Sequence, residues 1–274
     1  MATRLFRICA CAAIPWLTLL CVSLAQEQTF VAPYVPTVVE DVELMLDVAD
    51  VRPHDYVIDL GSGDGRIVIA AANRGALGHG IELDPELVAL ARENGEVAGV
   101  ADRVAFEQGD IFAATIDRAT VVTLYLFPEA NLQLRPKLLA ELRPGTRVVS
   151  NSFHMEDWNP DVHDMSARSS GGILLWIIPA RIDGNWRLTI DQDDSATFTV
   201  RQRYQEIELE VTAFASIPAV ESADLKGDRI RFALGSEDAT YVFDGTVDGD
   251  TMHGYVQIER EDGKSIAVWQ AVRE

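Results

Sequence analysis

Three alternating glycines follow an acidic residue at the end of a predicted strand. The segment runs Val-Ile-Asp-Leu-Gly-Ser-Gly-Asp-Gly-Arg over residues 57–66 and continues into an Ala-rich helical pattern. A strand, a tight turn and a helix N-terminus bring backbone N–H groups close to a nucleotide-like ligand. The dinucleotide fingerprint is G-x-G-x-x-G, but Gly61, Gly63 and Gly65 are spaced as G-x-G-x-G, and Arg66 stands where the last glycine should be. The spacing therefore makes a nicotinamide or flavin dinucleotide the weaker candidate.

Two acidic residues further along the chain complete a nucleoside-binding pattern. Glu82 stands 21 residues after Gly61, at the tip of the second predicted strand. An acid at this distance from the glycine turn can accept hydrogen bonds from both ribose hydroxyls. Asp110 ends a third short strand, where it can accept a hydrogen bond from the exocyclic amine of adenine, with Ile111 or Phe112 beside the ring. The three pieces together predict an adenosine-containing ligand.

This arrangement resembles the S-adenosylmethionine (SAM) loop of class I methyltransferases. A lone glycine turn is often only a structural connection between a strand and a helix, whereas three pieces in the correct order and spacing favour the ligand. We therefore expect SAM as the cofactor and no metal. The residues predicted to bind SAM in this part of the chain are Asp59, Gly61, Ser62, Gly63, Asp64, Gly65, Glu82, Asp110 and Ile111.

Alternating strand and helix patterns must position these residues. Strands are expected at 56–60, 78–83, 104–108, 121–125 and 147–153, and helices at 66–73, 85–98 and 131–141. A first helix, which Thr37 can cap, has apolar residues at helical spacing. Alternation of this kind predicts a doubly wound α/β domain. The apolar run 171–178 predicts a late, buried strand, antiparallel at the end of the sheet.

Aromatic residues after the fourth predicted strand are candidates for an acceptor channel. Methyl transfer from a sulfonium depends mostly on alignment and on desolvation of the nucleophile. In doubly wound folds such machinery lies at the carboxyl ends of the strands. Tyr125 and Phe127 lie there and are suited to line a channel for a methylammonium-like group, since aromatic faces favour such cations; core or lid packing is the alternative. Asn151 and His154 are candidate rim residues.

Five segments together resemble a small family of class I methyltransferases. They are Pro-Tyr-Val-Pro-Thr at 33–37, Asp-Leu-Gly-Ser-Gly-Asp-Gly-Arg-Ile-Val-Ile at 59–69, Gly-Ile-Glu-Leu-Asp-Pro at 80–85, Thr-Leu-Tyr-Leu-Phe-Pro at 123–128 and Leu-Arg-Pro-Lys-Leu at 134–138. The eukaryotic members are mitochondrial lysine N-methyltransferases that act on the ATP synthase c-subunit and on adenine nucleotide carriers. The resemblance covers residues 33–155. It implies that Tyr34, Pro36 and Thr37 close over the methionine end of SAM, with Tyr125 near the acceptor amine as the candidate catalytic residue.

Beyond about residue 180 the pattern changes to short alternating segments without a convincing helix. Asp-Gly turns separate them, for example at 183–184 and 244–245. Regular short strands with such turns predict an antiparallel meander, either a small barrel or a sandwich. This tail has no counterpart in the eukaryotic family members.

The N-terminal segment has the features of a secretory signal peptide. Arg4 and Arg7 give a positive start, residues 8–24 are almost wholly apolar, and Ser23 and Ala25 supply small residues before a cleavage point. We therefore expect an exported protein, periplasmic or extracellular, with an uncleaved membrane anchor as the alternative. All three cysteines lie in this segment, so the mature chain offers none for a disulfide, a metal site or a nucleophile.

The mature chain is strongly acidic. Without the leader it has 21 basic against 43 acidic residues, a formal net charge of −22. Such a surface repels nucleic-acid phosphates and anionic membranes. We therefore expect no nucleic-acid partner, and membrane contact only through an uncleaved leader. A lysine-bearing protein substrate is electrostatically compatible, although the acidity also serves solubility.

The sequence as a whole predicts a SAM-dependent methyltransferase that acts on a lysine side chain of a protein. Its predicted parts are a leader at 1–25, a methyltransferase domain at 26–179 and a β-rich domain of unassigned role at 180–274. The alternative is an exported binding protein with a non-catalytic methyltransferase-like domain, whose β-rich domain binds a ligand or partner. An NAD-linked oxidoreductase ranks third. Calorimetry with SAM and with NAD separates the three.

Overall fold

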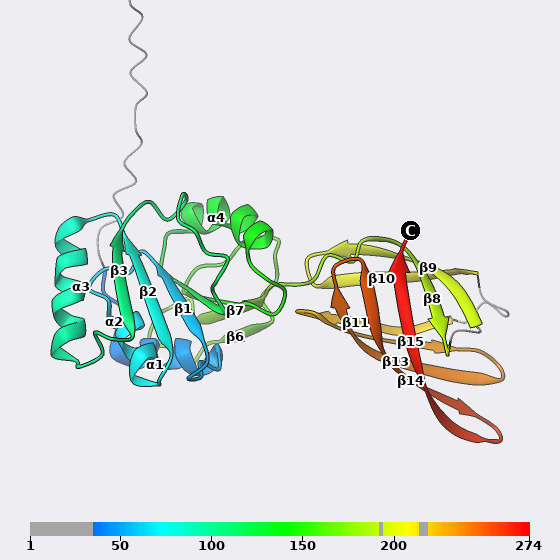
Figure 1. Cartoon of the computed structure of the whole chain (residues 1–274). Coiled ribbons are helices and arrows are strands. Elements are labelled where there is room, and N and C mark those ends of the chain that lie inside the picture. The colour runs from blue at the N-terminus through cyan, green and yellow to red at the C-terminus, as the bar shows by residue number, and fades with distance from the viewer. Residues whose placement is uncertain (1–34, 192–193, 214–218) are drawn as a thin grey trace, which may run out of the picture. The chain divides into compact units, whose positions relative to one another are not determined.

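The computed structural model describes residues 35–191, 194–213 and 219–274 (Figure 1). The predicted leader at 1–25 and Tyr34 lie outside these residues. The described strands form two sheets, which belong to one compact unit that extends to Glu274. None of the helices in the described part of the chain has the length and apolar character that a membrane crossing requires.

The first sheet has seven strands in the order β3-β2-β1-β4-β5-β7-β6. The strands are β1 (Tyr56–Leu60), β2 (Leu77–Glu82), β3 (Val104–Gln108), β4 (Val121–Leu124), β5 (Arg147–Asn151), β6 (Val162–Asp164) and β7 (Ile173–Ile177). The helices of this part are α1 (Val39–Val48), α2 (Arg66–Asn73), α3 (Pro85–Val97) and α4 (Pro128–Glu141). Strands β1 to β5 pair in parallel, whereas β7 is antiparallel to β5 and β6 is antiparallel to β7.

Helices cover both faces of this sheet, with α4 on one side and α1 and α2 on the other (Figure 1). Successive residues of a strand point to opposite faces, so Val57 of β1 packs with α1 and α2 while Ile58 packs with α4. Both faces of the central strands are therefore apolar, as the continuous apolar runs indicate. The prediction of a doubly wound α/β sheet is confirmed.

The strand order reverses between β1 and β4. From β1 the chain moves to β2 and β3 on one side of the sheet, and from β4 to β5 on the other. In open α/β sheets, ligands bind in the crevice outside the carboxyl ends of the strands at such a switch point. Leu60 pairs with Leu124 at these ends. The glycine turn after β1 and Tyr125 after β4 therefore emerge side by side.

Several predicted boundaries and one predicted cap differ from the structure. Helix α4 begins at Pro128 rather than at 131, and strand β5 ends at Asn151 rather than at 153. The apolar run that predicts an end strand forms β7, but β6 lies outside it at the edge. Thr37 does not cap α1, because Val38 occupies the N-cap position and no side chain caps it. These differences leave the order of elements unchanged.

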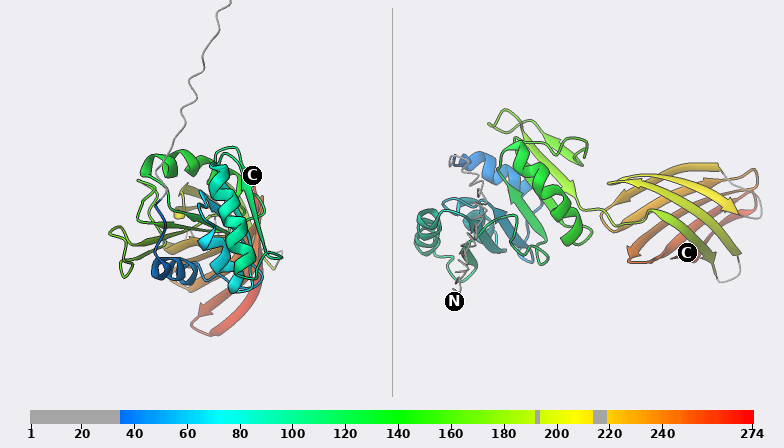
Figure 2. Two further views of the ribbon diagram at one scale, coloured as in Figure 1. Left: turned by 90° about the vertical axis from the view of Figure 1, so that its left-hand side faces the viewer. Right: turned by 90° about the horizontal axis from the view of Figure 1, so that it is seen from above.

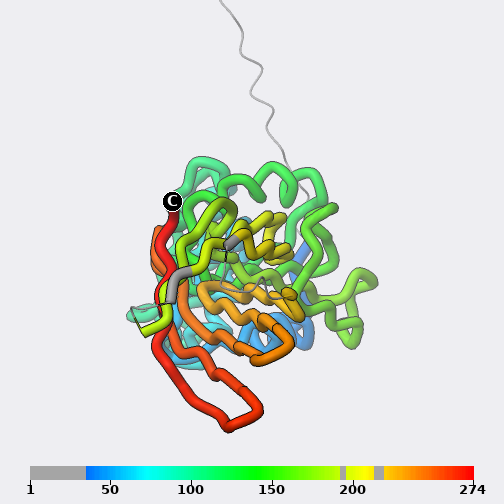
Figure 3. Tube along the Cα trace, turned by 90° about the vertical axis from the view of Figure 1, so that its right-hand side faces the viewer, coloured from blue at the N-terminus to red at the C-terminus, as the bar shows by residue number. Residues whose placement is uncertain are grey.

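The second sheet is an eight-stranded antiparallel meander in the order β10-β9-β8-β15-β14-β13-β12-β11 (Figures 2 and 3). Its edge strands β10 and β11 also contact each other, so the sheet is a nearly closed barrel, one of the two predicted forms. The strands are β8 (Gly184–Ile190), β9 (Asp194–Arg203), β10 (Glu206–Ala213), β11 (Ala219–Lys226), β12 (Arg229–Gly235), β13 (Ala239–Asp248), β14 (Thr251–Arg260) and β15 (Gly263–Arg273).

Aromatic side chains fill the interior of this barrel. The largest members of its buried cluster are Trp186, Phe198, Phe232, Phe243 and Trp269. The rings of Phe232 and Phe243 stack with their centroids 4.3 Å apart, and Trp269 meets both edge-on. Interlocked rings of this kind make the interior a packed core.

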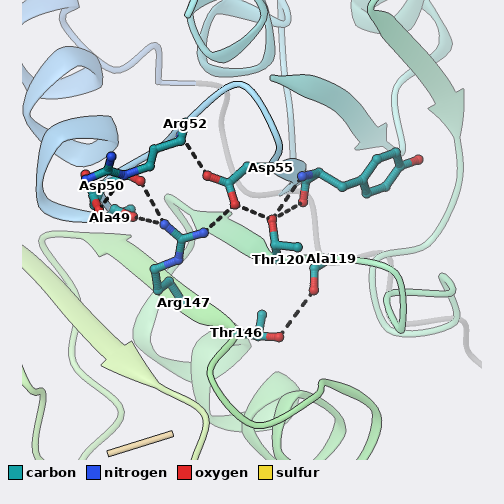
Figure 4. Close-up of polar contacts among 9 residues, drawn as sticks. Ala49, Asp50, Arg52, Asp55, Ala119, Thr120, Thr146 and Arg147 are labelled. Atoms are coloured by element: carbon teal, nitrogen blue, oxygen red, sulfur yellow. Dashed lines mark hydrogen bonds and ion pairs between the residues drawn. The ribbon is translucent and has the colours of Figure 1, made fainter. Parts of the chain in front are cut away.

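A polar network joins the amino ends of β1, β4 and β5, at the edge opposite the glycine turn (Figure 4). Asp55 is buried and accepts hydrogen bonds from the Thr120 hydroxyl at 2.7 Å and from the Arg52 backbone N–H at 2.7 Å. The Arg147 guanidinium forms an ion pair with the same carboxylate and donates to the carbonyl oxygens of Ala49 and Asp50. This network therefore connects the segment after α1 to the amino ends of these three strands.

Candidate active site

The glycine turn after β1 has a backbone that only glycine adopts easily. Gly61, Gly63 and Gly65 have φ angles of +85°, +52° and +81°, in the left-handed region that side chains disfavour. A Cβ atom on Gly61 would lie 2.9 Å from the Leu126 side chain, and one on Gly65 would lie 2.7 Å from the Phe106 ring. The glycines therefore let the chain turn within contact distance of two neighbouring elements and begin α2 at Arg66.

Glu82 lies beside this turn, as the spacing predicts. Its Oε2 atom accepts a hydrogen bond from the Gly63 backbone N–H at 2.9 Å, and its Oε1 atom accepts one from Asp84 N–H at 3.0 Å. Asp84 is in turn the N-cap of α3. The carboxylate of Glu82 is half-buried and held from two sides, with lone pairs left over for a ligand.

Asp59 lies in β1, two residues before the glycine turn. Its side chain is buried, and the Thr123 hydroxyl on β4 donates a hydrogen bond to it at 2.6 Å. Burial raises the pKa of Asp59 to about 7, against the lowering effect of the Thr123 hydrogen bond, and the negative charges of Glu82 and Asp64 add to the rise. A buried carboxyl group beside two further acids favours a positively charged ligand.

Ser62 has a buried hydroxyl that finds no hydrogen-bond partner among the described residues. Its oxygen would lie 2.5 Å from a Cβ atom on Gly80, so a glycine at that position leaves room for it. A buried polar atom without a partner is uncommon and needs an explanation. In the glycine turn, a bound polar ligand would supply the missing partner.

Arg66 ties the N-terminal segment to the glycine turn, a role that the sequence did not indicate. Its guanidinium forms an ion pair with Asp64 at 2.6 Å and donates to the Thr37 carbonyl oxygen at 2.7 Å. Thr37 is buried, whereas Pro36 is exposed. Of the predicted lid residues, Thr37 therefore lies next to the loop, and Tyr34 falls outside the described residues. Asp64, which the sequence predicts to contact the cofactor, also forms this ion pair with Arg66.

The predicted adenine-side residues follow β3. Asp110 is exposed, and its Oδ1 atom accepts a hydrogen bond from Phe112 N–H at 2.9 Å. Ile111 and Phe112 are half-buried and pack against the core cluster under α4. The backbone N–H of Gly109 donates to the Glu82 carbonyl oxygen at 2.9 Å, which places this loop next to the tip of β2.

An aromatic cluster lies at the carboxyl ends of β4 and β5. Tyr125 stacks on Phe153 with centroids 6.3 Å apart, and Phe127 lies 6.2 Å from the same ring in a tilted arrangement. Phe127 is 39% exposed, and the other two rings are half-buried. The structure thus brings together two residues that the sequence singles out and a third, Phe153, that it does not.

The two predicted rim residues differ in exposure. Asn151 is buried, and its Oδ1 atom accepts a hydrogen bond from the Ser152 hydroxyl at 3.0 Å, so it is no rim residue. His154 is exposed and meets the ring of His163 edge-on, with centroids 5.2 Å apart.

Comparison with known proteins assigns this chain to a family. Residues 59–162 match the model of the ANTKMT methyltransferase domain. A protein-lysine N-methyltransferase from the archaeon Saccharolobus islandicus is 46% identical over 132 residues, which are 47% of this chain and 81% of that protein. The chain belongs to this methyltransferase family.

Other members of the family are longer outside the matched region. The adenine nucleotide translocase lysine N-methyltransferase of Mus musculus is 40% identical over 131 residues, 47% of this chain and 56% of that protein. The ATP synthase c-subunit lysine N-methyltransferase of Homo sapiens is 36% identical over 129 residues, 47% of this chain and 55% of that protein. This methyltransferase thus spans little more than half the length of these animal relatives.

A solved structure resembles about half of this methyltransferase. It is described as an RNA methyltransferase from Salinibacter ruber in complex with S-adenosyl-L-homocysteine. It is 53% identical, covers 54% of this chain and 96% of that chain, and superposes with a TM-score of 0.52. The relatives thus differ in their named acceptor, RNA in one and lysine in the others, so the acceptor must be argued from the chain itself.

The residues of the crevice fit a cationic adenosine ligand. SAM carries a sulfonium and an ammonium, and a positive charge beside Asp59 would offset the burial and the neighbouring acids that raise the pKa of its carboxyl group. The unpartnered Ser62 hydroxyl and the close glycine backbone offer further contacts. Sequence reasoning predicted from spacing that Asp59, the three glycines and Glu82 lie near one another, as the structure shows. It missed Thr123, Arg66 and Phe153, because a lone threonine, arginine or phenylalanine has no distinctive pattern.

Proposed function

We propose that this methyltransferase uses SAM to methylate the ε-amino group of a lysine side chain in a protein. The observation that carries the proposal is the convergence of the buried Asp59 and the half-buried Glu82 on one glycine turn. An open aromatic cluster stands beside this turn, where β4 ends. Acidic side chains next to aromatic rings suit a cationic methyl donor and an amine acceptor.

Each residue of the crevice has a defined task in this proposal. Glu82 accepts hydrogen bonds from the ribose hydroxyls, Asp59 accepts them from the ammonium group, and Asp110 accepts them from the adenine amine. When bound, SAM supplies a methyl group on a sulfonium, which is a good leaving group without acid assistance. The chain therefore contributes alignment and exclusion of water more than acid–base chemistry.

The acceptor amine must be neutral to attack, so a lysine ammonium first gives a proton to water. Tyr125 and Phe127 flank the path to the crevice and hold the alkyl chain and the nitrogen through their ring faces. We assign no general base among the described residues, since alignment accounts for the reaction class.

The charge of the chain favours a protein acceptor over RNA. The RNA methyltransferase from Salinibacter ruber raises RNA as the second candidate. Binding of RNA depends on lysine and arginine contacts to phosphates, whereas this sequence has 43 acidic against 23 basic residues. The names of the archaeal and animal relatives also state lysine. These facts support a basic protein segment as the acceptor.

The test combines SAM binding with transfer of a labelled methyl group. Wild-type protein and Glu82→Gln are titrated with SAM by calorimetry and incubated with tritiated SAM and either poly-L-lysine or a synthetic RNA. We expect label in poly-L-lysine alone. We expect a loss of SAM affinity of about 10- to 100-fold in Glu82→Gln, the size of a lost charged hydrogen bond.

The matched control is Glu141→Gln at the C-terminal end of α4, where the exposed carboxylate pairs with Lys137. It must bind SAM like the wild type. Absence of SAM binding by the wild type would refute the proposal, and label in RNA but not in poly-L-lysine would replace the acceptor.

A further inference from the structure

The chain makes an unusual turn at the end of β5. Ser152 has a φ angle of +70°, in the left-handed region that non-glycine residues rarely adopt. The Phe153 backbone N–H donates to the Asn151 carbonyl oxygen at 3.0 Å, so these three residues form a γ-turn. A γ-turn with a positive central φ is rare and strained. The turn ends the strand and redirects the backbone at Phe153.

Buried polar side chains fix this turn through hydrogen bonds to its backbone. The Asn131 side-chain amide, fully buried at the start of α4, donates to the Phe153 carbonyl oxygen at 3.2 Å and to the Ser150 hydroxyl oxygen at 3.3 Å. The Ser150 hydroxyl is also fully buried and donates to the same Phe153 carbonyl at 3.0 Å. The position of the Phe153 backbone is therefore fixed by two hydrogen bonds inside the protein.

Two neighbouring glycines, Gly171 and Gly172, pack against the turn. The Ser152 backbone N–H donates to the Gly172 carbonyl oxygen at 2.8 Å. A Cβ atom on Gly171 would lie 2.0 Å from the Ser152 carbonyl oxygen, so only glycine permits this approach. Strained backbone that its surroundings over-determine in this way is typical of functional sites.

The turn places the Phe153 ring in the aromatic cluster at the carboxyl ends of β4 and β5. Phe153 is half-buried and stands between Tyr125 and Phe127, with centroids about 6 Å from each. A cation is attracted to a ring face within about 6 Å of its centroid. A single cation can therefore contact Phe153 and a second ring of the cluster at once.

We propose that Phe153 is a specificity-determining residue that binds the alkylammonium of the acceptor and favours its methylated forms. Asn131 and Ser150 act as positioning residues for it. This inference rests on the proposed function and names the acceptor chemistry of the same site. In each transfer the N–C bond forms as the S–C bond breaks, and the positive charge passes from sulfur to nitrogen. Ring faces at the nitrogen stabilise this charge as it develops.

The same physics explains a preference for methylated lysine. Each added methyl group replaces an N–H donor with a polarizable surface and weakens the hydration of the cation, whereas ring faces attract the charge undiminished. Recognition of quaternary ammonium groups by aromatic cages follows this rule.

The binding test uses free Nε-trimethyl-lysine and its uncharged isostere, in which carbon replaces the ammonium nitrogen. Both are titrated by NMR into the full chain saturated with S-adenosyl-L-homocysteine. We expect roughly 2- to 30-fold tighter binding of the cation, the range of cation–π energies. Phe153→Leu should lose this preference and Phe153→Tyr should keep it. Tyr255→Leu, a change of an exposed ring on β14, should leave it unchanged.

The product test measures mono-, di- and trimethyl-lysine in poly-L-lysine hydrolysates by mass spectrometry. Phe153→Leu and Asn131→Leu should shift the products towards monomethyl-lysine while their affinity for SAM stays at the wild-type value, which also shows that they are folded. Equal binding of cation and isostere, or an unchanged product distribution in Phe153→Leu, would overturn the inference. A failure of the proposed function shows itself separately, as absence of SAM binding.

Discussion

Asp59 is the residue on which the electrostatics of the crevice depend. Burial raises its pKa to about 7, so the carboxyl is neutral in half of the molecules near that pH when no ligand is bound. Because the pKa is raised on folding, the folded state keeps a proton that the unfolded chain loses between about pH 4 and pH 7. The free energy of unfolding of the ligand-free protein should therefore fall as the pH rises from about 4 to about 7.

The same titration predicts how SAM affinity depends on pH. The ligand's positive charge favours the ionised carboxylate, so binding releases a proton from Asp59 below pH 7. We expect SAM affinity to rise with pH up to about 7, by at most tenfold per pH unit, and to level off above it. Calorimetry in two buffers of different ionisation enthalpy counts the protons released. Asp59→Asn should bind SAM more weakly and without this dependence; a retained slope in that variant would assign the proton to another group.

Some residues of the site are predictable from the sequence, and others are not. Glu82 and Asp59 follow from spacing, because the glycine turn sets the distance to the neighbouring strand ends. Phe153 does not, because the sequence predicts one continuous strand over residues 147–153. The γ-turn at Ser152 depends on Asn131 and Gly171, which are distant in sequence. Contacts between distant residues leave no local signal.

Secondary-structure elements were predictable where their patterns are strong. Strands β1 and β3 and helix α2 have the predicted bounds, because apolar runs and the glycine turn delimit them. Strand β6 has three residues and one apolar side chain, too few for a pattern. Strand β7 lies between β5 and β6 because it pairs with both. The periodicity of a sequence does not determine which strands pair.

Among the contacts that join secondary-structure elements, the Asp55–Arg147 ion pair is expected to contribute to stability and not to SAM binding. With the Thr120 hydrogen bond to Asp55, it joins the amino ends of β1, β4 and β5 (Figure 4). The glycine turn lies at the opposite, carboxyl end of β1. Arg147→Met leaves the buried Asp55 carboxylate without its cation, which typically costs about 3–5 kcal/mol. We expect a fall of this size in the free energy of unfolding by urea titration, with SAM affinity of the folded protein unchanged.

The double variant Asp55→Asn with Arg147→Met is the control. It removes the uncompensated charge and should recover part of the lost stability. A single variant as stable as the wild type would show that the pair contributes nothing.

The whole molecule combines the family's sheet with a second sheet. Trp158 after β5 stacks on Tyr204 of the β9–β10 turn at 5.5 Å between centroids, and its indole N–H donates to the Gln205 side-chain oxygen at 2.8 Å. Arg203 and Arg135 both bind Asp157, and they lower the pKa of this carboxyl to about 2. The strands of the second sheet were predictable from their Asp-Gly turns, but no sequence pattern indicates these contacts with the first.

The predicted leader is a property of the whole chain that an intact-mass measurement tests. We propose that the protein is exported and cleaved after Ala25. Mass spectrometry of the native protein from fractionated cells should find a mature N-terminus at Gln26. An N-terminus at Met1 in the cytosolic fraction would refute export and would place the enzyme where SAM is made.

The central claim is that residues 61–65, Asp59 and Glu82 bind the adenosine and methionine parts of SAM. A crystal structure of the full chain soaked with S-adenosyl-L-homocysteine tests it directly. We predict electron density against the glycine turn, with both ribose hydroxyls within hydrogen-bond distance of the Glu82 carboxylate and the ammonium group next to Asp59. Density elsewhere, or an empty crevice at a saturating concentration, would contradict the claim.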